Sequence, residues 1–251
     1  MDVLVCVKRV PDTGAKIVLT DDNQEIDTSN LGFTMSPHEE CAVEEAIQIA
    51  EETGGTATAL TVGAADADEQ VRTAIAMQAD EGVLLDNGGD EWGPRDTAAT
   101  IAEYAEDGAF DLLLFGNESA DQASHQVGIR VANELGLPVV AGIKSLDIED
   151  GTAIAKREVS GGDEVYELPL PAVVTVKEGL NEPRYPSMRS KMQARRQEIG
   201  GYDVEPAGKE DLQKIKLVAP ETDDSEAEIL GEGPEATDEI LEVLRDDVEV
   251  I

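Results

Sequence analysis

Apolar and polar positions alternate over the first 140 residues in the pattern of strands that are each followed by a helix. Residues 3–7 (VLVCV) form a near-continuous apolar run, which predicts a strand covered on both faces. Residues 36–55 start with Ser36 as a candidate N-cap, Pro37 and then Glu39, and they end in a glycine pair, so they predict a helix. Similar patterns predict strands at 56–62, 82–86 and 111–116 and helices at 71–79, 95–107 and 120–136. This alternation predicts βαβ crossovers and an α/β fold with a doubly wound, mostly parallel sheet.

The pattern changes after residue 140. Residues 152–160 and 164–170 alternate in steps of two around GGD, which predicts a β-hairpin, and residues 171–176 predict one more buried strand. The chain then turns irregular. From about residue 203 it is polar and acidic, and it closes with a predicted amphipathic helix at 236–247. We therefore expect a C-terminal extended arm with a peripheral helix.

Acidic residues dominate the charge of the chain. There are 55 Asp and Glu against 19 Lys and Arg, which gives a formal net charge of −36. This balance argues against nucleic-acid binding, because association with phosphate depends on Lys and Arg. The acidic residues are spread over the whole sequence, and the aliphatic content is too high for a disordered acidic chain. We interpret the chain as a halophilic protein from a high-salt cytoplasm, where charges are screened within about 3 Å at 1 M salt.

Targeting features are lacking in the sequence pattern. Two cysteines are too few for a disulfide framework. The N-terminal MDVLVCVKRV lacks the long apolar stretch of a signal peptide, and no run approaches the roughly 18 apolar residues of a membrane span. We expect a reduced, cytoplasmic protein.

One stretch, RYPSMRSKMQARR at 184–196, departs from the acidic background. It holds five of the basic residues and none of the acidic ones. Two interpretations remain open from the residues: a basic patch that caps a helix end, or a recognition surface.

Candidate binding loops follow from the predicted fold, because ligands of open α/β sheets bind outside the carboxyl ends of the strands. Residues 8–14, the helix start at Ser36 and residues 116–128 lie there. In the last, two glycines around small and polar residues would let backbone amides approach a phosphate beside a helix N-terminus. The alternative is an ordinary polar loop with a helix cap.

Catalytic and metal-binding patterns are not found. His38 falls in a first helical turn and His125 in a polar loop, and no serine or cysteine is placed as a nucleophile. The carboxylates lack metal-ligand spacing, and neither G-x-G-x-x-G after residues 3–7 nor a P-loop occurs. We predict no catalytic residues and no metal.

Several motifs together resemble one family. VLVCVKRVPDTGAKI, MSPHEECAVEEAI, VRTAIAMQAD, DLLLFG and LPLPAVVTV followed by LNEPRYPSM occur in the order seen in the electron transfer flavoprotein β-subunit. The resemblance runs over residues 1 to about 200, and LNEPRYPSM is its most specific part.

The resemblance implies an electron carrier subunit rather than an enzyme. It implies a Rossmann-like, adenine nucleotide-binding fold, an α-subunit partner that holds most of a FAD, and AMP or a second FAD in the β-subunit. Electrons would come from flavin dehydrogenases such as the acyl-CoA type and pass to a membrane quinone oxidoreductase. By the same resemblance, residues 1–183 form the nucleotide-binding domain, 184–200 a recognition loop or helix, and 201–251 an acidic arm and helix that contact the partner subunit.

The family's nucleotide site maps onto the loops already identified. It comprises Cys6, Ser36, Pro37, His38, Glu39, Val62, Gly116, Asn117, Glu118, Ser119, Ala120, Asp121, Gln122, Ala123, Ser124, His125, Gln126 and Val127. Asp121, Gln126 and Gly128 match the usual family pattern. Ser36 and His38 stand where the family has Asn and Phe, and Asn117, Glu118, Gln122 and Ala123 also depart from it.

Two further groups of residues are implied. Thr13 and Glu158 match positions that lie toward the FAD of the α-subunit. Residues of the basic stretch match the loop that docks on dehydrogenases, with Met188 as its exposed apolar anchor. This group comprises Arg184, Tyr185, Pro186, Ser187, Met188, Arg189, Met192, Arg195 and Arg196.

A competing hypothesis from a different class is a stand-alone adenine-nucleotide sensor of related fold, which would need neither flavin nor partner. The EPRYPSM segment disfavours it, because a sensor has no use for a long extension that carries a recognition motif.

Overall fold

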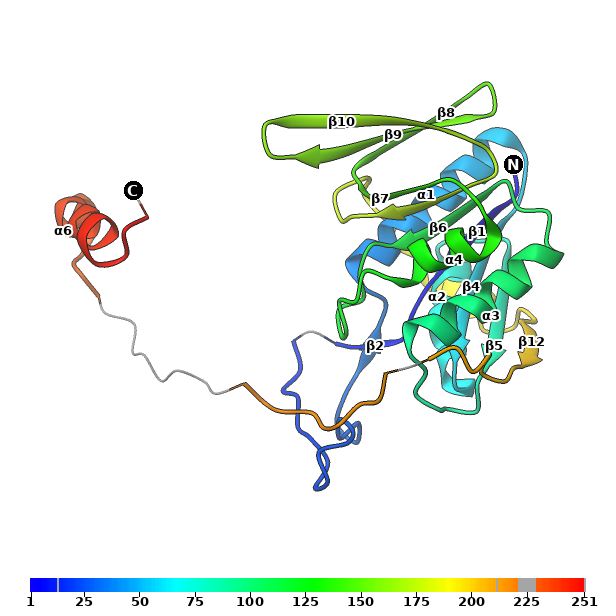
Figure 1. Cartoon of the computed structure of the whole chain (residues 1–251), viewed down its shortest axis with the longest axis horizontal. Helices are drawn as coiled ribbons and strands as arrows, with labels where there is room; N and C mark the ends of the chain where they lie inside the picture. Colours follow the sequence, from blue (N-terminus) through cyan, green and yellow to red (C-terminus); the bar gives the residue numbers. More distant parts are fainter. Residues whose placement is uncertain (13, 211, 221–228, 251) are drawn as a thin grey trace.

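The centre of the structure is a seven-stranded sheet in which every pair of neighbouring strands is parallel (Figure 1). A computed structural model describes residues 1–12, 14–210, 212–220 and 229–250. Across the sheet the strands run β12 (Gly200–Asp203), β5 (Glu81–Asp86), β4 (Ala57–Gly63), β1 (Val3–Cys6), β6 (Leu112–Gly116), β11 (Ala172–Val176) and β7 (Val139–Ile143). The predicted doubly wound parallel sheet is confirmed.

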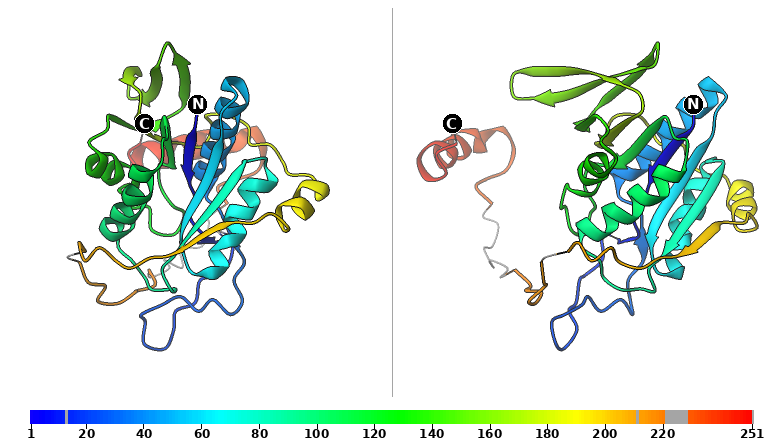
Figure 2. Two further views of the ribbon diagram at one scale, coloured as in Figure 1. Left: turned by 90° about the vertical axis from the view of Figure 1, so that its right-hand side faces the viewer. Right: turned by 45° about the vertical axis from the view of Figure 1, so that its right-hand side comes forward.

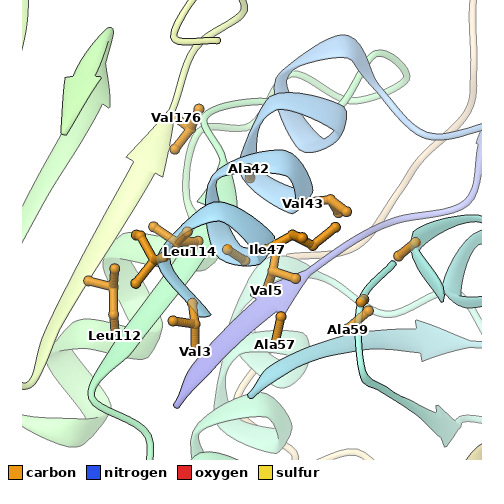
Figure 3. Packing of buried hydrophobic residues seen from close by; sticks show 14 of the residues in the cluster. Val3, Val5, Ala42, Val43, Ile47, Ala57, Ala59, Leu112, Leu114 and Val176 are labelled. Carbon is orange, nitrogen blue, oxygen red and sulfur yellow. The ribbon is translucent and has the colours of Figure 1, made fainter. Parts of the chain in front are cut away.

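Helices cover both faces of this sheet (Figure 2). On one face lie α1 (Pro37–Thr53) and α2 (Asp68–Ala76), the latter entered through a 3₁₀ turn, Ala65–Ala67; α3 (Pro94–Asp107) and α4 (Val127–Leu135) lie on the other. Because successive strand residues point to opposite faces, β1 contributes to both cores. Val3 and Val5 pack with Ile47 of α1 (Figure 3), whereas Leu4 and Cys6 belong to the second, smaller cluster.

The strand order places a topological switch point beside β1. The chain moves from β1 through α1 to β4 and through α2 to β5, and α3 then carries it back to β6 on the other side of β1. Loops leaving β1 and β6 therefore diverge at the carboxyl edge of the sheet, which is where ligands of such folds bind.

A separate antiparallel sheet projects from the body. The predicted hairpin is confirmed as β9 (Thr152–Val159) and β10 (Gly162–Pro169), and a third strand, β8 (Ser145–Glu149), pairs with β9. Two short strands, β2 (Val10–Pro11) and β3 (Phe33–Thr34), form a small ladder near the carboxyl edge. The strand β8 was not predicted, although Leu146 and Ile148 alternate with polar neighbours.

The boundaries of two predicted helices were wrong. The helix predicted at 120–136 begins only at Val127, because Ala123 and His125 have φ values of 45° and 54°, which an α-helix does not allow. The helix predicted at 71–79 begins at Asp68 and ends at Ala76, and Gln78 beyond it has a φ of 95°. The N-terminal boundary at Ser36 and the stop at Gly54, with a φ of 71°, were predicted correctly.

The C-terminal part leaves the sheet and returns to it once. The segment predicted to be irregular contains α5 (Met188–Ala194), after which β12 pairs with β5 at the sheet edge. The predicted helix at 236–247 is confirmed as a 3₁₀ turn (Gly233–Ala236), α6 (Thr237–Glu242) and a π-helical turn (Val243–Asp247), which stand apart from the sheet (Figure 1). Across the described ranges, the helices are too short or too polar to cross a bilayer.

Candidate functional site

A cavity of about 870 Å³ lies at the switch point. Its floor comes from the carboxyl ends of three strands: Cys6 of β1, Val62 of β4, and Phe115 with Gly116 of β6. This volume falls within the range of about 300–1,000 Å³ that is usual for small-molecule sites. The position is the one that the strand order favours for a ligand.

The loop at 117–126 forms one wall and is fastened to β11. The Asn117 backbone N–H donates to the carbonyl of Val176 at 2.8 Å, and the Asn117 side-chain oxygen accepts from the Thr175 hydroxyl at 2.8 Å. On its other side, the Asn117 amide lies 3.0 Å from Nδ1 of His125. The left-handed conformation of His125 is thus held by side-chain contacts within the loop.

The N-terminus of α4 opens toward the same cavity. Gln126, the N-cap, makes no capping hydrogen bond, because its side-chain oxygen instead accepts two bonds from Arg130, at 3.0 and 2.7 Å. Gly128 allows this helix to approach the sheet, since a Cβ there would lie 2.8 Å from Thr175 Cγ2. The first-turn amides are therefore available to an anion, which the helix dipole favours.

Two cations follow β1 along the cavity wall. The Lys8 ammonium pairs with Asp121 at 2.6 Å. Burial alone would raise the pKa of Asp121, but the charge of Lys8 and hydrogen bonds from Lys8, Ser119 and Gln122 together outweigh it and lower that pKa. Arg9 pairs with Asp66 at 3.0 Å and lies 3.5 Å above the centre of the Phe33 ring, while its buried Nη1 has no partner in the described structure.

The start of α1 is fitted closely against β6. The Glu39 carboxylate accepts from the Ser36 N–H at 3.0 Å, and the Ser36 hydroxyl accepts from the Ala120 N–H at 3.0 Å. A Cβ on Gly116 would lie 2.6 Å from Glu39 Cγ, so only glycine fits there. Burial raises the pKa of Glu39 to about 8, and burial also raises the pKa of the Cys6 thiol. A protonated, buried thiol is not a nucleophile.

Both histidines contact Glu118. Its carboxylate lies 2.7 Å from Nε2 of His125 and 3.9 Å from Nε2 of His38. Burial lowers the pKa of His38. In the described residues no group of three His, Cys, Asp or Glu side chains is arranged to hold a metal ion.

A smaller hollow of about 290 Å³ lies on the other side of Glu118. It is lined by His38, Lys144 and Glu158 among others, and Lys144 pairs with Glu158 at 2.9 Å. Thr13, the other residue predicted near the flavin, lies outside the described residues.

Most of the predicted nucleotide-site residues line the large cavity. They are Cys6, Glu39, Val62, Gly116, Asn117, Glu118, Ser119, Asp121, Gln122, Ser124, His125, Gln126 and Val127. Ser36, Pro37, His38, Ala120 and Ala123 are not among the lining residues, although Ser36 and Ala120 join the two walls. The grouping of the three loops is therefore as expected, whereas some individual side chains support the wall instead of facing the cavity.

The outer part of the cavity was not predicted. Trp92, in the loop before α3, lines it together with Ile26 and Leu217. The Leu217 N–H donates to the Asn23 carbonyl at 2.8 Å, so the arm lies beside the loop that precedes β3. The sequence carries no local signal for this contact, because the two segments are almost 200 positions apart. Lys8 and Arg9 belong to the predicted candidate loop at 8–14, although neither was assigned an individual role.

The basic stretch divides into anchored and exposed residues. Tyr185, Met188 and Met192 are 89%, 75% and 55% exposed. Arg189, Arg195 and Arg196 are also exposed, whereas Arg184 is half-buried and forms ion pairs with α1. Apolar and basic side chains are thus both exposed within this stretch.

Comparisons with known proteins agree on one family. The family described as "Electron transfer flavoprotein domain" matches residues 25–207. The chain is 36% identical over 259 aligned positions to electron transfer flavoprotein subunit beta of Bacillus subtilis, covering 100% of both chains. It is 41% identical over 204 positions to the same subunit of Syntrophomonas wolfei, covering 79% of this chain and 78% of the relative. For the human subunit the identity is 32% over 248 positions, covering 97% and 96%.

Proposed function

The chain belongs to the electron transfer flavoprotein β-subunit family, and from that premise we propose that it works in a heterodimer whose α-subunit shares a FAD with it. As a member of this family it is an electron-transfer subunit and not an enzyme. FAD supplies the redox chemistry when bound, and the protein supplies binding, orientation and electrostatics.

We further propose that the large cavity binds an adenine nucleotide, either AMP or a second FAD. The observation that carries this proposal is the cavity of about 870 Å³ at the switch point, into which the uncapped N-terminus of α4 opens. The amides of that helix would take a phosphate, with Lys8 and Arg9 nearby. Gly116 allows the start of α1, with Glu39, to pack against β6 beside the cavity.

The neighbouring hollow suits contact with the shared FAD. Glu158 and Lys144 form an ion pair at its rim, and Glu158 remains largely exposed on β9. In this proposal Glu158 faces the α-subunit. The acidic arm after residue 201 would add to the contact with that subunit.

The exposed surface of residues 185–196 supports docking of flavin dehydrogenases, such as those of the acyl-CoA type. Met188 is exposed within a basic stretch of the chain, and the flexible methionine side chain can adapt to the surfaces of several partners. Electrons would then pass to a membrane quinone oxidoreductase. We place this exchange in a high-salt cytoplasm because of the net charge of −36.

The proposal is tested by purifying the chain with its α-subunit and counting cofactors. We expect a yellow heterodimer with one FAD at the subunit contact and a second adenine nucleotide in the β-subunit. One FAD and one AMP per heterodimer would identify AMP as the ligand of the β-subunit. Two FAD per heterodimer would identify a second FAD there. A colourless monomer that is stable alone and saturable by AMP or ATP would instead support the nucleotide-sensor hypothesis.

Docking is tested with Met188→Ala. We expect slower electron transfer from a dehydrogenase at unchanged flavin content, because hot-spot side chains at an interface carry most of the binding energy. Charge reversal at Arg195 and Arg196 should weaken docking in a salt-dependent way. Rates equal to wild type in both variants would refute the docking surface.

A further inference from the structure

Arg184 lies at the start of the exposed docking surface but is itself bound to α1. Its guanidinium Nε lies 2.9 Å from one Glu44 carboxylate oxygen, and Nη2 lies 3.1 Å from the other. Nη1 and Nη2 reach the two carboxylate oxygens of Glu51 at 2.8 and 3.1 Å. The Arg184 backbone N–H also donates to Glu44, at 3.0 Å. This forked geometry is the strong form of an arginine–carboxylate contact.

The α1 helix provides this site by its own spacing. Glu44 and Glu51 are seven residues apart, so they lie on one face two turns apart. Glu44 is buried, with its side chain only 5% exposed. Burial alone would raise the pKa of Glu44, but hydrogen bonds from Arg184 and Gln48 outweigh it and keep that pKa below its usual value. Glu44 is therefore a buried carboxylate whose charge Arg184 compensates.

Two further contacts fasten the same segment. The Asn181 amide donates to the Cys41 carbonyl at 3.0 Å and to Glu45 at 2.9 Å, so the chain is attached to α1 before Arg184. At the far end, Arg72 of α2 donates to the carbonyls of Ala194 and Gln197, at 2.9 and 3.1 Å. The short helix α5, which carries Met188 and Met192, is thus held at both ends.

We infer that Arg184 is a positioning residue for partner docking, which holds α5 on α1 so that Met188 and its neighbours are presented in one orientation, and that it does not contact the partner. This inference rests on the proposed docking function. The contacts of Arg184 go to Glu44 and Glu51 of α1, and its side chain is 25% exposed, whereas Tyr185, Met188 and Met192 are mostly exposed.

The physical reason for such a residue is the shortness of α5. Seven residues are too few for a helix to be stable without tertiary contacts. If the segment is released from α1, only a fraction of molecules presents the docking surface correctly. The apparent affinity then falls in proportion to that fraction.

The test uses the αβ complex and a flavin dehydrogenase of the acyl-CoA type that reduces the wild-type complex. The variants are Arg184→Ala, Arg184→Lys and Glu44→Gln, with Glu52→Gln, exposed on the same helix, as the matched control. We expect Arg184→Ala to raise the apparent KM for the complex roughly three- to tenfold at unchanged kcat and flavin content, which corresponds to a fall of the docking-competent population to between about a third and a tenth. Arg184→Lys, which keeps the charge but loses the fork, should fall between it and wild type.

Glu44→Gln gives the sharpest comparison. Since Glu44 is buried beneath the segment, it has no access to a partner, so a rise in apparent KM from this variant must act through Arg184. The effect of Arg184→Ala should also persist from 0.5 to 3 M KCl, because a partly buried pair is screened less than an exposed one. An effect that salt abolishes, with Glu44→Gln equal to wild type, would mean that Arg184 contacts the partner and would overturn the inference.

A double-mutant cycle separates this inference from the docking proposal itself. If Arg184 acts only by setting the fraction of molecules that present Met188, the two effects multiply, so Arg184→Ala should cost the same free energy with Met188→Ala as with wild type. A cost of Arg184→Ala that shrinks in the Met188→Ala background would mean that the two side chains act on the partner as one direct contact and would overturn the inference. An effect of Met188→Ala without any effect of Arg184→Ala would overturn the inference alone, and no effect of either variant would refute the docking surface as well. Thermal midpoints of all variants identify any that fail to fold, in which case Arg184→Lys and Glu44→Gln still decide.

Discussion

At the cavity, the residue type at position 116 and the protonation of Glu39 follow from close packing and burial. Gly116 is a glycine because Glu39 lies where its Cβ would be, and Glu39 keeps its proton because it is buried. Neither is catalytic. They determine the shape and charge of the surface that a nucleotide would meet.

Replacing Gly116 by alanine tests the close approach. We expect Gly116→Ala to lower the free energy of unfolding by about 1–3 kcal/mol, the usual cost of overpacking, because the added methyl group would displace Glu39. Urea denaturation of the purified chain measures this. Gly201→Ala is the matched control, since a Cβ there meets nothing within 4 Å, and it should change stability by less than about 0.5 kcal/mol. Equal effects of the two substitutions would contradict the close approach.

The raised pKa of Glu39 predicts a pH dependence with a definite sign. Between the usual value of 4.5 and about 8, the folded chain holds a proton that the unfolded chain releases. The free energy of unfolding therefore falls as pH rises through this window, by at most about 1.4 kcal/mol per pH unit. Glu39→Gln removes this term, so its stability relative to wild type should increase from pH 5 to pH 8 and then level off.

Urea denaturation at pH 5, 6.5 and 8 provides the measurement, with Glu52→Gln as an exposed control on the same helix. A difference between Glu39→Gln and wild type that stays constant over this range would show that Glu39 ionises as an ordinary carboxyl group.

At the scale of elements, periodicity and capping predicted the framework well. The helix that begins after Ser36, the parallel strands up to β6, the hairpin and β11 follow from apolar runs and turn residues that act locally. The rule that ligands of α/β sheets bind outside the carboxyl ends of the strands also identified the loops that meet at the cavity. These features depend on neighbours within a few positions, which is the information that a single sequence contains.

Several of the elements that were missed depend on distant contacts. β12 is a short, exposed, glycine-containing strand that exists because β5 offers it an open edge. α5 is stabilised by Arg72 and α1 through side chains more than a hundred positions away. The sequence pattern predicts a helix from residue 120, but residues 120–126 belong to a loop in which contacts of Asn117 with Thr175 and His125 favour another conformation. In each case tertiary hydrogen bonds outweigh local preference.

The arm forms part of the cavity, which gives a prediction at this scale. The Gln24 amide donates to the Ile215 carbonyl at 2.9 Å, and Lys214 pairs with Glu91. We expect Lys214→Ala combined with Gln24→Ala to speed nucleotide release about fivefold or more, since each such contact contributes about 1 kcal/mol. Displacement of labelled AMP from the complex, followed through the single Trp92, measures the rate. Lys216→Ala, an exposed neighbour, should release nucleotide at the wild-type rate.

At the scale of the whole molecule, charge is the dominant feature. The described ion pairs engage only some of the 55 carboxylates, so the surface keeps a large excess of negative charge. The exposed docking surface with Arg189, Arg195 and Arg196 is an exception to this charge. High salt would weaken steering by these arginines, which leaves apolar contact through Met188 and Met192 with a larger share of the binding energy.

The excess negative charge predicts that stability depends on salt. At 0.1 M salt charges interact over about 10 Å, and at 1 M over about 3 Å, so mutual repulsion of the carboxylates weakens steeply in this range. We expect the thermal midpoint of the heterodimer to rise as KCl increases from 0.1 to 2 M. A variant with three exposed carboxylates of α3 neutralised, Glu103→Gln, Glu106→Gln and Asp107→Asn, should need less KCl to reach the same midpoint, because it carries less repulsion. Circular dichroism during heating measures both. A midpoint that stays level or falls with KCl, in either protein, would mean that repulsion between surface carboxylates does not limit the folded state and that the acidic composition has another cause.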